Sequence, residues 1–467
     1  MATITVRSGQ SCPGRKTLSR RAAGGIADAT RGEAGIDALE GRKSCTRHGD
    51  AHAAGVMNKR AAMIIVSLCV VYVISQFLRS SVAVIAPDFI RELSLDAEAL
   101  GILTGAFFIT FALTQIPTGI LLDRYGARRT MSGLMLFAVA GCLVFARADG
   151  MVGLTVGRVL MGVGTAGLLA GSLFVIARWF ASDRYAGMAS LVIAGGSAGG
   201  LMATTPLAFA ADWLGWRGVF LAVGATTLVF SGFAYASIRD APPEHPFHSR
   251  RRENAREILR GLRDVWAFRD TRHVFAINLV CYGSLLTIIG LWGGPYLADV
   301  HDLDGVARGN VLLAMGVAMI VGNLIYGRLD RIFNTRKWII VFGAVATLLM
   351  FVVLAVLPHA PVWQIAVAFS VLGAVGSYGV VIMAHGRSLY PEYLIGRGIT
   401  TLNIAVMVGV AALQVAAGFV LGPYTGSDGR IPEDAYRLVF WMLAAVVACG
   451  LVAYLPVGDR RPHDGDP

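Results

Sequence analysis

The sequence has little charge and few cysteines. Only 15% of its 467 residues are charged and six are cysteine, whereas soluble domains carry about 25% charged residues. No two cysteines have the CxxC spacing of a zinc or redox site. The composition therefore argues against a water-soluble domain, a disulfide scaffold and a metal centre, and it excludes a disordered, collagen-like or coiled-coil chain.

Enzyme motifs are missing as well. The sequence contains no Walker A loop, GxSxG elbow, HExxH helix or Rossmann fingerprint in its expected context. No residues are therefore available for ATP-driven transport or for hydrolysis. We predict that the protein is not an enzyme and needs no cofactor or metal.

Long apolar runs dominate the rest of the chain. The sequence is 55% hydrophobic with a mean hydropathy of +0.62, and a helix needs about 20 apolar residues to cross a bilayer. None of the runs has the two-residue alternation of a barrel strand. We therefore predict an all-α membrane protein with twelve transmembrane helices, at roughly 61–87, 99–122, 129–147, 151–177, 186–211, 216–237, 274–298, 307–327, 337–357, 361–385, 398–421 and 437–455.

The basic residues predict the orientation. If the N-terminus is inside, arginines cluster in the inner connections at 124–129, 178–184 and 328–337 and between spans six and seven. The outer connections carry mostly single arginines among acids, as the positive-inside rule requires. We expect both termini in the cytoplasm, a bacterial inner membrane, contacts with lipids and a monomer. The net charge of +11 is then a topology signal and does not indicate a nucleic-acid partner.

Several segments lie outside the bundle. Residues 1–56 are predicted to form a disordered cytoplasmic tail, and the basic flank that begins at Met57 suggests that translation starts there. Residues 239–272 form a cytoplasmic linker, and its later part is an amphipathic helix for the inner leaflet or a solvated connection. Residues 458–467 form a second cytoplasmic tail.

The two halves, 57–238 and 273–457, repeat one pattern. "GILLDRYGARR" follows the second span and "GRLDRIFNTRK" follows the eighth, and their Asp, Arg and last Arg match at one constant spacing. The second copy keeps Asp330 and Arg331 but lacks a glycine that corresponds to Gly126. A duplicated bundle of this kind places a binding site at mid-membrane between the halves.

The first copy of this loop resembles the signature loop of the major facilitator superfamily. "GRVLMGVGTAG" and "GWRGVF" are similar to two further motifs of that family. The resemblance implies two pseudo-symmetric six-helix halves that rock in alternating access. It also implies that the loop residues hold one gate state at the cytoplasmic face, although they could simply anchor the loop; these residues are Gly119, Asp123, Arg124, Gly126, Arg128, Arg129, Asp330 and Arg331.

Arg79 is the main candidate for binding a solute. It lies inside span one, where a charge normally faces a cavity or a partner. Tyr72, Ser75 and Gln76 lie on the same helical face, so the four form a polar stripe. The alternative is that Arg79 extends to the outer interface or bonds a carbonyl.

Polar residues on later spans are secondary candidates. Each could simply form an interhelical hydrogen bond, but the resemblance places them on helices that line the family's cavity: Asn278, Tyr282, Tyr378, Asn403 and Gln414. No acidic residue lies in the middle of any span. Coupling to an ion could therefore involve Arg158, His385 or the rim carboxylate Asp88, or be absent.

A pathway with a buried arginine and no buried acid attracts anions. We therefore expect a secondary active transporter for a small organic anion such as a carboxylate. A dipeptide or phosphate-ester carrier of the same superfamily is the alternative within this class. A membrane sensor or receptor that kept the fold without transporting is the alternative from another class.

Overall fold

The computed structural model describes residues 59–180, 182–241, 263–357, 360–391, 394–426 and 429–461. This part of the chain is helical and contains no β-strand. Ten of its helices are long and apolar enough to cross a membrane. The expected tail, the start at Met57, most of the linker and residues 462–467 lie outside the described residues.

The first half contains two helices with an internal turn. Gly126 of α3 has φ +80° and Gly215 of α7 has φ +67°, a region of backbone conformation that favours glycine. α3 therefore holds the second and third predicted spans, and α7 holds the end of the fifth and all of the sixth. The elements are Lys59–Ser80, α2 (Val82–Leu93), α3 (Ala97–Ala146), α4 (Met151–Thr165), α5 (Leu168–Trp179), α6 (Ser182–Met202) and α7 (Thr205–Ser237).

The second half follows the same order of spans. Its seventh and tenth spans are interrupted by a π-helical and a 3-10 turn. The elements are α9 (Thr271–Thr287), η2 (Ile288–Trp292), α10 (Gly293–Asp299), α11 (Gly305–Ile332), α12 (Lys337–Val356), α13 (Val362–Val375), η3 (Gly376–Tyr378), α14 (Gly379–Arg387), α15 (Ile395–Leu421), η5 (Gly422–Tyr424) and α16 (Glu433–Tyr454). With the turns inside α3 and α7, these helices account for the twelve predicted spans and confirm the predicted fold class.

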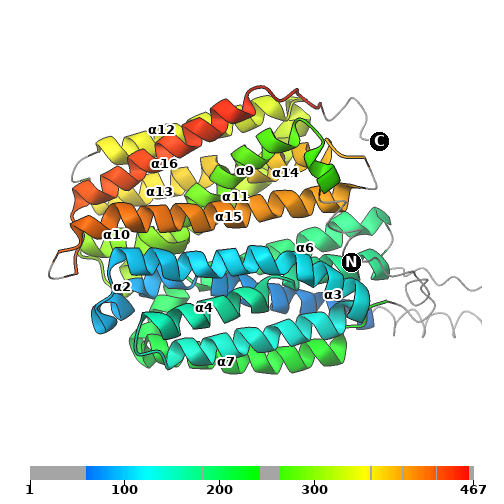
Figure 1. Ribbon diagram of the computed structural model, residues 1–467, viewed down its shortest axis with the longest axis horizontal. Helices are drawn as coiled ribbons and strands as arrows, with labels where there is room; N and C mark the ends of the chain where they lie inside the picture. Colours follow the sequence, from blue (N-terminus) through cyan, green and yellow to red (C-terminus); the bar gives the residue numbers. More distant parts are fainter. Residues whose placement is uncertain are drawn as a thin grey trace, which may run out of the picture.

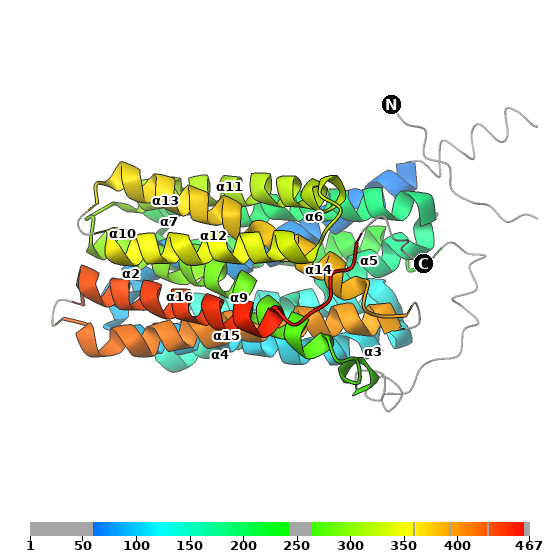
Figure 2. The same cartoon turned by 90° about the horizontal axis from the view of Figure 1, so that it is seen from above.

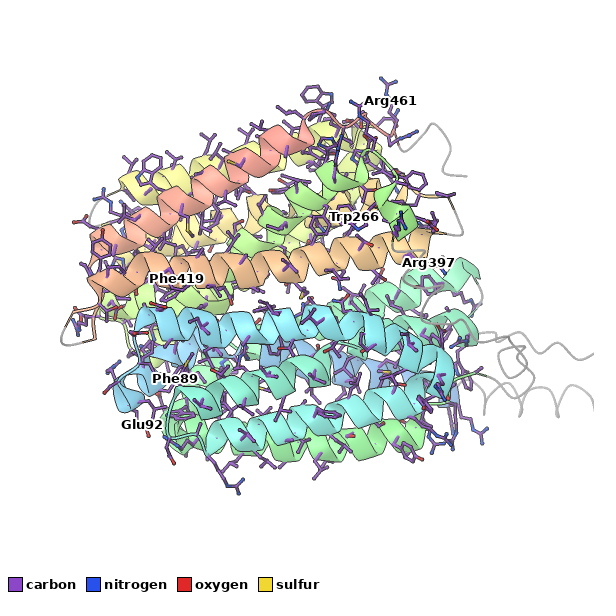
Figure 3. The ribbon with its side chains drawn as sticks, in the orientation of Figure 1. Phe89, Glu92, Trp266, Arg397, Phe419 and Arg461 are labelled. Carbon is purple, nitrogen blue, oxygen red and sulfur yellow. The ribbon has the colours of Figure 1, made fainter. Side chains whose placement is uncertain are left out.

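The helices of both halves run along one common axis (Figures 1 and 2). Figure 3 places Arg397 and Arg461 at one end of the molecule, which we call the terminal end, and Glu92 at the opposite or far end. α12 and α16 lie on the side of the second half that faces away from the first half (Figure 1).

The apolar core joins the halves unevenly. One cluster of buried residues extends from the first half into the far-end segments of the second half, including Leu291 and Leu312. The terminal end of the second half has a cluster of its own, which includes Ile277 and Leu402. The described halves are therefore packed together most continuously at the far end.

The described end of the linker packs on protein. Val265 is fully buried with Tyr390 and Leu394, and the Thr271 hydroxyl donates to the Val265 carbonyl over 2.9 Å. Trp266 is half exposed. Tyr390 and Leu394, which follow the tenth span, therefore cover Val265. The amphipathic helix on the inner leaflet stays a prediction, since most of the linker lies outside the described residues.

Candidate solute-binding site

Arg79 lies next to the end of the first helix and is almost fully enclosed. It is 8% exposed, and its guanidinium carbon lies 4.9 Å from the centroid of the Phe111 ring on α3. No carboxylate in the described part of the chain pairs with it, and its Nε has no hydrogen-bond partner there. Because buried charges are normally paired, Arg79 is a cation that lacks a counter-charge among these residues.

The other residues of the predicted stripe are also enclosed. Ser75 and Tyr72 are buried, and the buried Oε1 of Gln76 has no partner among the described groups. Tyr72 lies close enough to interact electrostatically with both Arg79 and Tyr282 of α9. The structure thus brings two residues of the first half near one predicted residue of the second half.

A stack of two aromatic rings connects Arg79 to Arg158. The guanidinium carbon of Arg158 lies 4.3 Å from the Phe107 ring centroid. Phe107 and Phe111 are stacked with centroids 6.2 Å apart, and Arg79 covers Phe111 from the other end. Cations are attracted to the faces of aromatic rings. The two rings of α3 therefore hold both arginines at defined positions beside that helix.

Arg158 also fixes the backbone beside Arg79. It is fully buried and donates to the Leu78 carbonyl over 2.9 Å. The hydroxyl of Ser81, the residue between the first helix and α2, donates to the same carbonyl over 3.3 Å. Arg158 is therefore a positioning residue for this segment, and a role in coupling stays a prediction.

Two predicted amides of the second half bond within that half. The Nδ2 of Asn278 donates to the Leu402 carbonyl over 2.7 Å, and the Nε2 of Gln414 donates to the Leu286 carbonyl over 3.1 Å. The oxygen of the Gln414 carboxamide is buried without a partner in the described chain. Asn403 is half-buried. Both bonded amides connect neighbouring helices, as polar residues in membrane bundles often do.

Tyr378 and His385 lie toward the outside of the second half. The buried Tyr378 ring packs over Gly343 of α12. His385 is fully buried, and its Nδ1 lies 2.6 Å from the hydroxyl of Tyr454 on α16. Since α12 and α16 face away from the first half (Figure 1), these two side chains are not brought together with Arg79.

The signature loop is held by the segment after the sixth span. The Asp240 carboxylate occupies the space that a Cβ at Gly126 would need, with atoms 2.3–2.6 Å from the ideal position. Its Oδ1 accepts the backbone N–H of Arg128 over 2.8 Å. Asp123, Arg124 and Arg129 are exposed, and a Cβ at Gly119 would meet open space.

The second copy of the loop is held in the same way. We call each of the two carboxylates, Asp240 and Asp459, with its hydrogen bonds to the loop a clasp. Asp459, just after the twelfth span, accepts the Thr335 hydroxyl over 2.6 Å and the backbone N–H groups of Arg336 and Lys337 over 3.1 and 3.0 Å. Asn334 has φ +47°, so it provides the left-handed turn in place of the missing glycine.

The acidic residues of the two copies differ in burial. Asp330 is nearly buried and lies 3.7 Å from the Arg336 guanidinium, whereas its equivalent Asp123 is exposed. Arg331, like Arg124, is exposed.

The far end contains direct polar contacts between the halves. Arg308 of α11, only 3% exposed, donates to the Val84 carbonyl over 3.1 Å and lies 3.8 Å from the Asp88 carboxylate. The Thr205 hydroxyl donates to Asn310 over 2.8 Å. Asp88 therefore belongs to the contact that closes this end.

Several residues of the site were missed by sequence reasoning. Phe107 and Phe111 resemble ordinary core residues in an apolar span, and only their contacts with the arginines distinguish them. Gln115 lies one turn beyond Phe111, and its buried Nε2 has no partner in the described chain. A polar residue inside a span was a usable signal in that case. The described residues contain no group of three acidic, His or Cys side chains that could hold a metal ion.

Comparison with known proteins gives the family. The family model for the Major Facilitator Superfamily matches residues 68–322 and 275–467. A provisionally named tartrate transporter of Agrobacterium vitis is 23% identical over 62% of this chain and 68% of its own length. The nitrate/nitrite transporter NrtP of a Picosynechococcus species is 28% identical over 49% of this chain and 46% of its own length. A provisionally named L-galactonate transporter of Escherichia coli is 25% identical over 83% of this chain and 88% of its own length.

Solved structures agree on the fold. A bacterial homologue of the human lysosomal transporter Spinster superposes with a TM-score of 0.73 at 16% identity, covering 85% of this chain and 96% of that chain. The nucleoside transporter NupG gives a TM-score of 0.67 at 11% identity over 84% of this chain and 98% of that chain. The family model covers more than half of the chain, and ten helices of its described part are apolar and long enough to cross a membrane. The chain is therefore a multi-pass integral membrane protein that belongs to the Major Facilitator Superfamily.

Proposed function

We propose that this protein is a secondary active transporter of a small organic anion and that Arg79 binds the carboxylate of the solute. The observation that carries the proposal is the enclosed guanidinium of Arg79, which has no carboxylate partner in the described chain. A charged arginine inside a membrane-spanning segment is costly, by up to about 2.5–3.5 kcal/mol at the centre of a helix on insertion scales. A bound carboxylate offsets this cost with charge-assisted hydrogen bonds.

The relatives support an anionic solute. Tartrate, L-galactonate and nitrate, the solutes in the names of three of them, are all anions. Arg158 adds a second buried positive charge beyond the ring stack. A positive field of this kind favours anions over cations in the pathway.

Alternating access accounts for the uneven contact between the halves. The far end is closed by Arg308 and Asp88 and by a continuous apolar core. In this proposal the terminal end faces the cytoplasm of a bacterial inner membrane, and the protein works as a monomer. The signature loop holds the gate at the cytoplasmic end, while Asp88 is the coupling candidate best placed to report on closure.

Transport into liposomes tests the proposal. The full chain would be reconstituted, and uptake of labelled mono- and dicarboxylates would be measured with and without a pH gradient. We expect Arg79→Gln to abolish uptake, while the same change at Arg147, an exposed arginine of a far-end loop, leaves it intact. Uptake that is indifferent to Arg79, or that is restricted to neutral solutes, would refute the role of Arg79.

The same preparation separates the alternatives. Solute binding without uptake under any gradient would identify a receptor that has kept the fold. Uptake of dipeptides or phosphate esters in preference to simple carboxylates would keep the transporter and replace the solute class. An enzyme is not proposed, because relatives and family are transporters.

A further inference from the structure

Arg79 and two glutamines on neighbouring turns carry buried polar atoms without partners. The Nε of Arg79, the Oε1 of Gln76 and the Nε2 of Gln115 are buried, and none has a hydrogen-bond partner in the described chain. Buried polar atoms are nearly always satisfied in native proteins. These three atoms therefore call for a partner that is not among the described residues.

Helix geometry places the two glutamines at one depth. The first helix runs from the terminal end toward the far end, and the first part of α3 runs back (Figure 1). The contact between Arg79 and Phe111 fixes the level at which these helices face each other. Gln76 lies one turn before Arg79 and Gln115 one turn after Phe111, so both are about one turn closer to the terminal end.

The unsatisfied atoms need both hydrogen-bond acceptors and a hydrogen-bond donor. Arg79 and the nitrogen of Gln115 need acceptors, which a carboxylate supplies. The oxygen of Gln76 needs a donor, which an ionised carboxylate lacks. In the structure the open position on Gln76 is an acceptor and the open position on Gln115 is a donor.

We infer that the solute is a hydroxylated carboxylate, with its carboxylate on Arg79 and a hydroxyl between Gln76 and Gln115. A hydroxyl is both donor and acceptor, so it meets the needs of both carboxamides. This inference rests on the proposed function, because it assumes that Arg79 binds the carboxylate. An anion without a hydroxyl leaves the Gln76 oxygen unsatisfied, and a site built around a hydroxyl strongly discriminates against such analogues.

Matched solutes test the inference on the unmodified protein. Succinate and malate share chain length and both carboxylates and differ by one hydroxyl. Propanoate and lactate are the corresponding monocarboxylate pair and also differ by one hydroxyl. Initial uptake by the full chain in liposomes would be compared within each pair. We expect the hydroxylated member of the pair to be taken up at least tenfold more efficiently. Equal efficiency within both pairs overturns the inference.

Variants then assign the hydroxyl to the glutamines. We expect Gln76→Leu and Gln115→Leu to lower the uptake of malate or lactate by a larger factor than the uptake of the partner without the hydroxyl, so that the preference within each pair is lost. Gln364→Leu, at the start of α13 in the other half, is the matched control. A hydroxyl preference that survives both substitutions overturns the assignment.

The two proposals fail in different ways. If both members of a pair are taken up equally and Arg79→Gln abolishes that uptake, the organic-anion transporter stands. Only the role of the hydroxyl is then refuted. Uptake that Arg79→Gln does not affect removes the proposed function itself. A dipeptide that outcompetes malate also overturns the inference, since its ammonium group is then the donor to Gln76.

Discussion

Arg308 of the second half reaches across the far end to the Asp88 carboxylate, with 3.8 Å between nitrogen and oxygen. The arginine is buried, whereas the carboxylate is partly exposed. A hydrogen bond from Arg308 to the Val84 carbonyl spans the same boundary. An ion pair and a hydrogen bond from one side chain therefore join α11 to α2. In the proposed alternating access, both break when the far end opens.

Removing this link is expected to open the far end. Arg308→Gln loses the charge, and breaking a partly buried pair weakens the closed state by about 1–2 kcal/mol, or roughly tenfold in population. Labelling of a Thr205→Cys variant by a membrane-impermeant thiol reagent should become faster by that factor. Arg437→Gln is the control, since Arg437 also lies at the far end but bonds carbonyls of Ala355 and Val356 within its own half. Equal acceleration in both variants would contradict the link.

A close backbone approach makes Gly294 a second probe of the same closure. A Cβ at Gly294 of α10 would lie 1.8 Å from the Ala83 carbonyl oxygen in the other half. We expect Gly294→Ala to hold the far end partly open and to speed the same labelling, while the apparent Tm changes little because each half keeps its own packing. Gly305→Ala faces the same boundary with its nearest atom at 3.6 Å, and it should behave as the unmodified protein. A Gly294→Ala variant that labels slowly would show that the contact yields without opening.

Stability should depend on the turn inside α3. Gly126 has φ +80° and ψ +168°, which costs a residue with a side chain about 1–3 kcal/mol, and the Asp240 carboxylate would also have to move. Gly126→Ala should therefore lower the apparent Tm by several degrees. Gly119→Ala, in the same loop motif with open space around its Cβ, should leave it unchanged. A similar Tm for both variants would mean that the Asp240 clasp adapts at no cost.

The Asp459 clasp predicts a pH dependence. Partial burial opposes ionisation of this carboxylate, but hydrogen bonds from Thr335 and from the backbone of Lys337 and Arg336 hold its pKa below the usual value. A carboxyl with a lowered pKa stabilises the folded state above its unfolded pKa of about 3.9, and this contribution is lost as the pH falls through the lower, folded value. The apparent Tm of Asp459→Asn should lie below that of the unmodified protein near neutral pH. The difference should shrink as the pH falls below about 4.

Asp149→Asn is the control for this titration. Asp149 is almost fully exposed, so its substitution should leave the apparent Tm unchanged at either pH. If the difference in apparent Tm between Asp459→Asn and the unmodified protein stays constant down to pH 3, the role of ionised Asp459 is contradicted.

Helical periodicity was enough to predict the fold and one side of the site. The apolar runs gave the twelve spans, and the spacing of Tyr72, Gln76 and Arg79 gave a shared face. Both are local properties of a single helix. The motif at Gly126 was equally visible, because a left-handed turn between two spans limits the choice of residue.

The other side of the site depends on which helices meet. Asn278 and Gln414 look like ligand groups in sequence, yet their amide nitrogens bond carbonyls of neighbouring helices. His385 is paired with a tyrosine that lies 69 residues away along the chain. Phe111 has no polar signal at all. A repeat of 3.6 residues shows the face of a helix but does not show its neighbour, so these partners appear only in three dimensions.

The clasps at Asp240 and Asp459 have a consequence for how the chain can be made. Each carboxylate follows the last helix of its own half and bonds the start of that half's third helix. Asp240 is the second residue of the 239–272 linker, so a chain break placed after it leaves both carboxylates joined to their own halves. We expect two separately translated fragments, divided in the linker, to insert as complete bundles and to reassemble into a working protein.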